Sequence, residues 1–97
     1  ILLKQDDLAG AEQHIGRALT LNPKEGRYHL TYSAVLLRKG WPDAAIAEAK
    51  RAITWRGDTT RAYLLIAEAY DLKKDKAAAA LYREKGAEEH RVHQPKR

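Results

Sequence analysis

The sequence repeats itself with a period of 34 residues. When the chain is shifted by that length against itself, Ala11, Ala45 and Ala79 coincide. The other coinciding sets are Ala18, Ala52 and Gly86; Leu2, Leu36 and Tyr70; and Leu19, Ile53 and Ala87. A period of about 20 to 50 residues is typical of solenoids, in which each repeat is one supersecondary unit stacked on its neighbours. We therefore expect a single domain of stacked units.

Each period predicts two short amphipathic helices. In the middle unit, Tyr28, Tyr32 and Val35 recur at spacings of three and four residues, which places them on one face of a helix. Gly40 ends that helix, and Pro42 stands where the first turn of the next helix tolerates proline. Helices are predicted in this way over residues 8–21, 25–39, 42–55 and 76–92. A further helix is predicted after Gly57, which ends the preceding helix, with Asp58 and Thr59 as its cap. Its apolar face consists of Tyr63, Ile66, Ala67 and Tyr70.

The two ends of the chain differ. Only residues 1–4 remain of the helix that would lead the first unit, and Asp6 and Asp7 are expected at a turn. Because Leu2 and Leu3 lack a covering helix, we expect the parent protein to continue upstream or this end to be buried in a contact. Seven charged residues of the last helix leave only a thin apolar stripe, which gives it the polar outer face that a capping unit needs. The chain thus divides into a partial first repeat (1–23), a second repeat (24–57), a third repeat with a capping helix (58–92) and a basic tail (93–97).

Residues 7–23, DLAGAEQHIGRALTLNP, resemble the second half of the tetratricopeptide motif. The small Ala11 and Ala18, with the larger Ile15 between them, carry this resemblance, which extends over nearly the whole chain. Small residues are needed where the two helices of a hairpin cross closely. The resemblance implies an all-α fold, a right-handed superhelix of antiparallel helical hairpins with about two and a half repeats. The Trp, Leu and Gly usual in the motif are replaced by His29, Tyr32 and Ser33.

The composition of the chain limits the classes of function that it can have. The net charge is +5, but basic and acidic residues are interspersed along nearly the whole chain, as on the solvated faces of ordinary helices. No apolar run approaches the roughly 20 residues that cross a bilayer, so membrane insertion is not expected. With no cysteine, the chain can form neither a disulfide framework nor a thiolate metal site. No targeting signal is present, which favours the cytoplasm, although the chain begins without Met and a signal can lie upstream.

Residues that could carry chemistry are few. The sequence contains no glycine-rich phosphate loop, no nucleophile elbow and no paired acid and base. His90 and His93 are spaced to share one helical face, but no third metal ligand stands at a recognisable spacing. His14 and His29 are isolated, and we expect them on the surface or packed within a hairpin. We therefore predict a protein that is not an enzyme and has no metal or cofactor.

The tetratricopeptide resemblance implies that a peptide or a partner-protein segment binds in a concave groove lined by the first helix of each hairpin. The predicted groove residues are those that face away from the hairpin partner. They are Arg27, Leu30, Thr31, Ala34, Leu37 and Arg38 on one helix, and Arg61, Leu64, Leu65, Glu68 and Asp71 on the next. Each leucine can instead pack between hairpins. Arg27 and Arg61 lie one period apart and can either hold carboxylates through charge-assisted hydrogen bonds or lie on the solvated surface.

We therefore expect a non-catalytic protein-protein interaction module, part of a larger scaffold or assembly protein, whose partner the sequence does not identify. One alternative is RNA binding, because Thr31, Tyr32 and Ser33 resemble the opening of the pentatricopeptide motif and the net charge is positive. That motif has a different period and does not predict the Leu-Asn-Pro ending at residues 21–23, so nucleic acid ranks second. The other alternative is self-association through the apolar N-terminal end.

Overall fold

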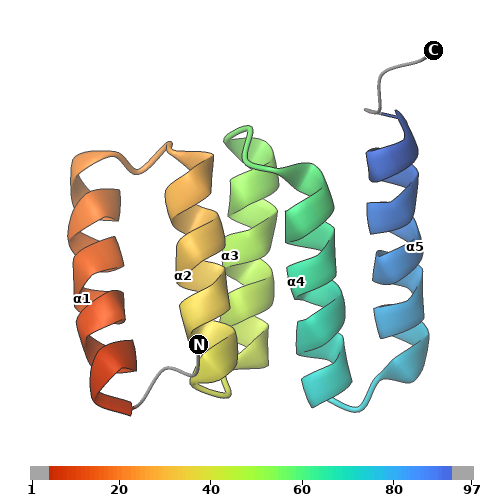
Figure 1. Ribbon diagram of the computed structural model, residues 1–97, viewed down its shortest axis with the longest axis horizontal. Helices are drawn as coiled ribbons and strands as arrows, with labels where there is room; N and C mark the ends of the chain where they lie inside the picture. The colour runs from red at the N-terminus through yellow and green to blue at the C-terminus, as the bar shows by residue number, and fades with distance from the viewer. Residues whose placement is uncertain (1–4, 93–97) are drawn as a thin grey trace.

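The computed structural model describes residues 5–92, and these residues form five α-helices and no strand. The helices are α1 (Gln5–Leu21), α2 (Gly26–Arg38), α3 (Pro42–Thr54), α4 (Thr59–Leu72) and α5 (Lys76–Val92). Each helix runs antiparallel to the one before it, and the turns alternate between the two ends of the molecule (Figure 1). The predicted all-α class is confirmed. The expectations for residues 1–4 and 93–97, including Leu2, Leu3 and the basic tail, lie outside the described residues.

Helix boundaries follow the sequence signals closely except at the start of α1. Helices α2, α3 and α5 begin and end within one residue of their predicted positions. By contrast, α1 begins at Gln5, so Asp6 and Asp7 lie in its first turn, and the turn predicted there is wrong. Neither Gly nor Pro interrupts this stretch, and acidic side chains are favoured at the positive end of the helix dipole. These properties extend the helix beyond the predicted start.

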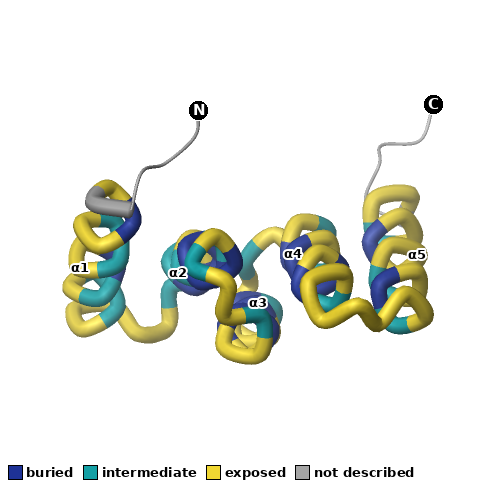
Figure 2. Tube along the Cα trace, turned by 90° about the horizontal axis from the view of Figure 1, so that it is seen from below, coloured by how far each residue is buried: buried dark blue, intermediate teal, exposed yellow. Residues whose placement is uncertain are grey.

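Helix α3 lies to one side of the other four helices. Seen along the helix axes, α1, α2, α4 and α5 form a row, and α3 lies beneath α2 and α4 (Figure 2). Helix α3 packs against both α2 and α4, and α2 also contacts α4 directly. Among the five described helices, α1 packs on α2 alone, and α5 packs on α4 alone. The contact between α2 and α4 is therefore covered by α3 on one side.

The turns that join the helices use the residues expected of them. Gly40 has a φ of +80°, in the left-handed region that favours glycine, and redirects the chain after α2. Pro42 is the first residue of α3, where its missing N–H leaves no hydrogen bond unmade. The side chain of Asp58 caps α4 by accepting a hydrogen bond from the backbone N–H of Arg61 at 3.1 Å. The predicted stop, first-turn proline and cap are confirmed.

The start of α2 packs directly against the turn between α3 and α4. A Cβ placed on Gly26 would lie 2.4 Å from Gly57 N and 2.7 Å from Trp55 O. A Cβ on Gly57 would lie 3.0 Å from the carbonyl oxygen of Ala52. Backbone thus meets backbone here, and a side chain on Gly26 would force the two segments apart.

Small residues dominate the contacts between the helices. Ala49, Ala52, Ala62, Ala69 and Ala79 are fully buried, and Ala45 is nearly so. Alanines at these positions let the helix axes approach closely, while the larger Ile66, also fully buried, fills the space between them. Except for Ala79, these residues belong to one core cluster, which draws on α2, α3 and α4 and has Tyr82 of α5 packed at its edge.

Ion pairs join helices at their ends. The ammonium of Lys39, which follows α2, lies 2.5 Å from the carboxylate of Glu12 on α1. Lys73, which follows α4, makes a 2.5 Å contact with Asp43 in the first turn of α3. The hydrogen bond to Asp43 raises the pKa of the Lys73 ammonium. Each pair links helices that are also neighbours in the packing.

Two polar side chains of α2 are buried against α3. Ser33 donates a hydrogen bond to the carbonyl oxygen of Ala45 at 2.7 Å. The ring of His29 contacts the carboxylate of Glu48 and the carbonyl oxygen of Pro23. His29 therefore packs within its hairpin, one of the two locations predicted for it.

Candidate binding groove

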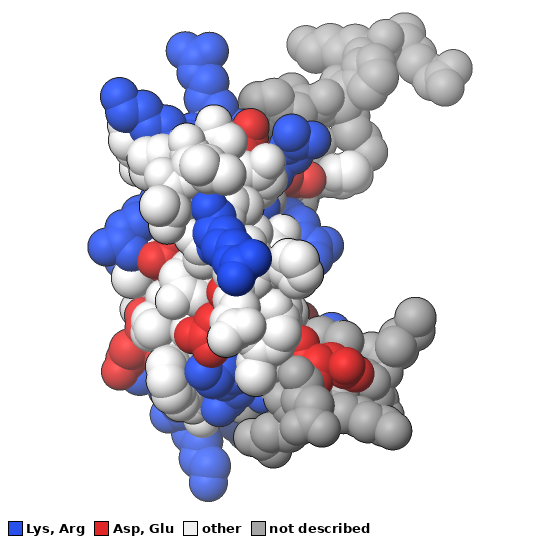
Figure 3. Space-filling model, turned by 90° about the vertical axis from the view of Figure 1, so that its left-hand side faces the viewer, with Lys and Arg blue, Asp and Glu red and all other residues white. Residues whose placement is uncertain are grey.

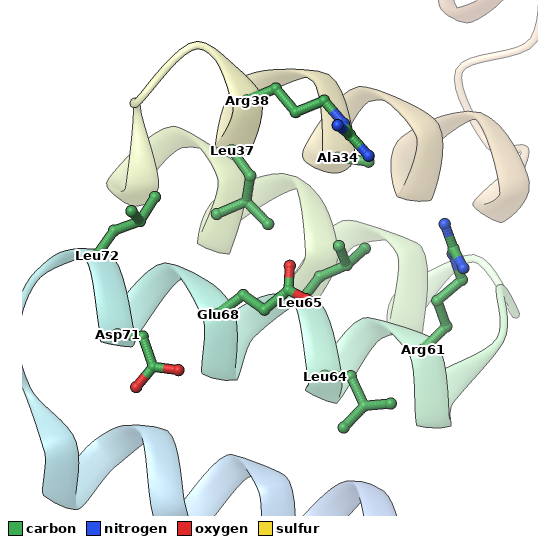
Figure 4. Close-up of a pocket in the computed structure, with 9 residues that line it drawn as sticks. All are labelled: Ala34, Leu37, Arg38, Arg61, Leu64, Leu65, Glu68, Asp71 and Leu72. Atoms are coloured by element: carbon green, nitrogen blue, oxygen red, sulfur yellow. The ribbon is translucent and has the colours of Figure 1, made fainter. Parts of the chain in front are cut away.

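A groove with a volume of about 600 Å³ lies between α2 and α4. The residues that line it are Ala34, Leu37 and Arg38 from α2, and Arg61, Leu64, Leu65, Glu68, Asp71 and Leu72 from α4. In Figure 4, Leu37 and Leu65 point into the space between the two helices. Both leucines are largely buried, at 9% and 8% exposure. They form an apolar floor that the existing core packing holds in place.

Two groove residues turn toward α5 instead. Leu64 and Asp71 point away from α2 in Figure 4. The carboxylate of Asp71 forms an ion pair with the guanidinium of Arg83 on α5. Leu64 lies beside Gly86, on which a Cβ would stand 3.4 Å from the leucine Cδ2, and 45% of Leu64 is exposed. The α5 side of the groove therefore offers an accessible apolar residue and, about two helical turns further along α4, a carboxylate that is already paired.

Three charged groups of the groove are unpaired. Within residues 5–92, no ion pair or side-chain hydrogen bond engages the guanidinium groups of Arg38 and Arg61 or the carboxylate of Glu68. All three residues are exposed. The side chain of Arg38 runs back along α2 over Ala34, so that its guanidinium extends toward the end of the groove where Arg61 stands (Figure 4). These groups can form ion pairs with a bound molecule without breaking existing ones.

The structure brings most of the predicted groove residues together. Ala34, Leu37, Arg38, Arg61, Leu64, Leu65, Glu68 and Asp71 all line the groove. Leu30 does not, and its assignment to the groove is corrected: it is only 5% exposed and belongs to the core cluster, together with Ala62 of α4. The reason is that α4 lies beside α2 and encloses this face of the helix.

Arg27 and Thr31 also lie outside the groove lining. The guanidinium of Arg27 is 3.6 Å from the carboxylate of Glu25, and the arginine side chain is 80% exposed. The hydroxyl of Thr31 donates to the carbonyl oxygen of Arg27 at 3.1 Å. Both residues occupy the exposed surface of the first turns of α2, so the predicted pairing of Arg27 with Arg61 in one groove wall is not observed.

Leu72 lines the groove but was not predicted to do so. It stands 53% exposed in the last turn of α4. Leu72 follows Arg38 by one repeat period, and Arg38 is a predicted groove residue. Applying the 34-residue period to each predicted position would therefore have found it.

Among residues 5–92, no group of three or more His, Cys, Asp or Glu side chains could hold a metal ion. His93, half of the predicted imidazole pair, lies outside the described part of the chain. None of the described helices combines the length and apolar character needed to span a membrane. On the face that α1 presents, Lys and Arg are interspersed with Asp and Glu (Figure 3), so no continuous basic surface forms there.

These features define an all-α protein with a surface groove that is apolar at its floor and charged at its rims. No protein-family model matches the sequence, and no match was found among curated proteins or solved structures. The tetratricopeptide resemblance therefore stays a prediction from the sequence.

Proposed function

We propose that this chain is a non-catalytic, tetratricopeptide-like interaction module that binds a segment of another polypeptide between α2 and α4. The observation that carries the proposal is the coexistence, in one groove, of a buried leucine floor and the unpaired charges of Arg38, Arg61 and Glu68. A polypeptide segment offers both apolar and charged side chains at regular intervals, and it can therefore satisfy both features at once.

Burial at equivalent positions supports the repeat architecture. Ala45 and Ala79, which are 34 residues apart on α3 and α5, are 1% and 0% exposed. Ala52 and Gly86, separated by the same period, are both buried. The two helical hairpins α2–α3 and α4–α5 thus place small residues at matching contact positions, as stacked repeats require. The right-handed superhelix is part of this proposal.

The distribution of polar groups favours a polypeptide over a small molecule. Sites for small molecules are concave and place a few polar groups around one compact ligand. Here Arg61 and Glu68 are separated by seven residues of helix, which corresponds to about 10 Å along the axis. Charges spread over that length can be matched by side chains several positions apart on a bound segment.

Selection from a random peptide library tests this function. The wild-type chain should enrich peptides that bind, and the Arg61→Glu variant should bind those peptides at least about threefold more weakly, since one ion pair becomes a repulsion. Arg17→Glu is the matched control, because Arg17 is exposed on α1, lies outside the groove and undergoes the same change of charge. Circular dichroism checks that both variants remain helical. Failure of the wild type to enrich any peptide, or equal binding by both variants, would contradict the proposal.

A further inference from the structure

The unpaired charges follow an order along the groove. Arg61 stands in the first turn of α4, and Glu68 follows about two helical turns later. The guanidinium of Arg38 reaches toward the Arg61 end (Figure 4), so both positive groups lie on that side of Glu68. Leu65 stands between Arg61 and Glu68 on α4 and points into the groove, as does Leu37 from α2. The groove is therefore positive near the start of α4 and negative toward its end.

The distance between the charges limits the conformation of a complementary segment. Arg61 and Glu68 are about 10 Å apart along the helix axis. A polyproline II segment rises about 3.1 Å per residue with three residues per turn, so side chains three positions apart lie on one side and about 9 Å from each other. An extended segment therefore fits the spacing of the two charges.

We propose that the groove selects an extended segment in which an acidic and a basic residue lie three positions apart with an apolar residue between them. The acidic side chain would pair with Arg38 and Arg61, the basic one with Glu68, and the apolar one would cover Leu37 and Leu65. This inference rests on the proposed function and specifies its ligand. Because the charged groups are exposed, their ion pairs contribute little to the affinity. Their main effect is on specificity, that is, on which segment binds.

Three synthetic peptides with identical Gly-Ser flanks test the inference by fluorescence anisotropy at low salt. The first carries the core Glu-Leu-Pro-Lys, the second the rearranged core Leu-Glu-Lys-Pro with adjacent charges, and the third Glu-Leu-Pro-Glu. The wild-type chain should bind the first peptide about fivefold more tightly than the other two. The Glu68→Lys variant should instead bind Glu-Leu-Pro-Glu most tightly, since the negative end of the groove has become positive. The Glu84→Lys variant is the control, because Glu84 is exposed on α5 and does not line the groove.

The outcomes separate this inference from the proposed function. Equal binding of the three peptides, or the same peptide preference in Glu68→Lys and Glu84→Lys, would overturn the charge order but leave groove binding intact. The inference also fails if library-selected peptides bind while none of the three designed peptides does. Tighter binding of a helical peptide with its charges seven positions apart would overturn the extended conformation. If neither designed nor selected peptides bind, the proposed function itself fails.

Discussion

Nδ1 of His29 lies 2.7 Å from Oε1 of Glu48, in the buried contact between α2 and α3. On the other side of the ring, Nε2 lies 2.7 Å from the carbonyl oxygen of Pro23. A carbonyl oxygen can only accept, so Nε2 carries a hydrogen and donates it. The second carboxylate oxygen of Glu48 contacts the guanidinium of Arg51. One imidazole thereby connects the turn after α1 to both helices of the following hairpin.

Removing either partner of this pair should destabilise the fold strongly. We expect His29→Ala and Glu48→Ala each to lower the free energy of unfolding by about 2 kcal/mol, because each leaves a buried polar group with only one of its two partners. The double variant should lose less than the sum, since the second substitution removes no remaining interaction between the two side chains. Urea unfolding of the four proteins measures this coupling. Strictly additive losses would show that the two side chains do not stabilise each other.

Two glycine-to-alanine substitutions should have opposite signs. Gly26→Ala places a methyl group against the backbone of Gly57 and Trp55, and we expect it to lower the free energy of unfolding by about 2 kcal/mol. Gly10→Ala lies within α1 with no atom within 4 Å of the new Cβ, and it should raise that free energy by about 0.5 to 1 kcal/mol. Denaturant unfolding gives both values. Destabilisation by both substitutions would contradict the open environment assigned to Gly10.

The cap of α4 provides a third prediction. Asp58→Ala removes the oxygen that accepts from the backbone N–H of Arg61, and we expect it to lower the free energy of unfolding by about 1 kcal/mol. Asp58→Asn keeps an accepting oxygen and should lose only a few tenths. Thermal unfolding compares the two. Equal losses would indicate that the charge of Asp58, rather than its hydrogen bond, stabilises the helix.

The ion pair of Lys73 with Asp43 should contribute to stability in a pH-dependent way. The hydrogen bond to Asp43 raises the pKa of the Lys73 ammonium above its ordinary value of 10.5. Because the pKa is higher in the folded than in the unfolded chain, the stabilisation is complete below the ordinary value and is lost as the pH rises through the folded value. The wild type should therefore have a slightly higher Tm than Lys73→Met at neutral pH. The two Tm values should converge in strongly alkaline buffer.

The comparison with Lys73→Met has two internal controls. Both chains contain the same tyrosines, so tyrosine ionisation at alkaline pH cancels in the comparison except at Tyr70, whose ring centroid lies 5.6 Å from the Lys73 ammonium. Asp43→Asn removes the other partner and should abolish the same pH-dependent difference. A Tm difference that stays constant with pH would show that Lys73 acts through packing instead of charge.

Local turn chemistry explains why the sequence predicted the helices well. Gly40, Pro42 and Asp58 act within a few residues of their own positions, so their effects are visible without knowledge of the packing. Leu30 and Leu64 show where such reasoning ends. They occupy the same position of the repeat, yet one is 5% exposed and the other 45%. Their environments differ because α4 lies beside α2, whereas within residues 5–92 no helix follows α5 to cover Leu64.

The residues of the groove were predictable where the 34-residue period and the exposed face of the helix indicate the same positions. Arg38, Arg61 and Glu68 line the groove, as expected because the exposed side of an amphipathic helix follows from its apolar pattern. Arg27 was misplaced because the groove does not extend to the first turn of α2. The length of a groove depends on how neighbouring helices pack, and the periodicity of a single helix does not contain that information.

Chemical-shift mapping of the isotope-labelled chain with the Glu-Leu-Pro-Lys peptide tests most directly whether the groove binds a polypeptide segment. Saturable shifts should concentrate on the backbone amides of Ala34, Arg38, Arg61, Leu65 and Glu68. The Arg61→Glu variant should show the same shifts only at higher peptide concentration. Shifts concentrated on α1 or on the outer face of α5, or spread evenly over the helices, would contradict the assignment of binding to the groove between α2 and α4.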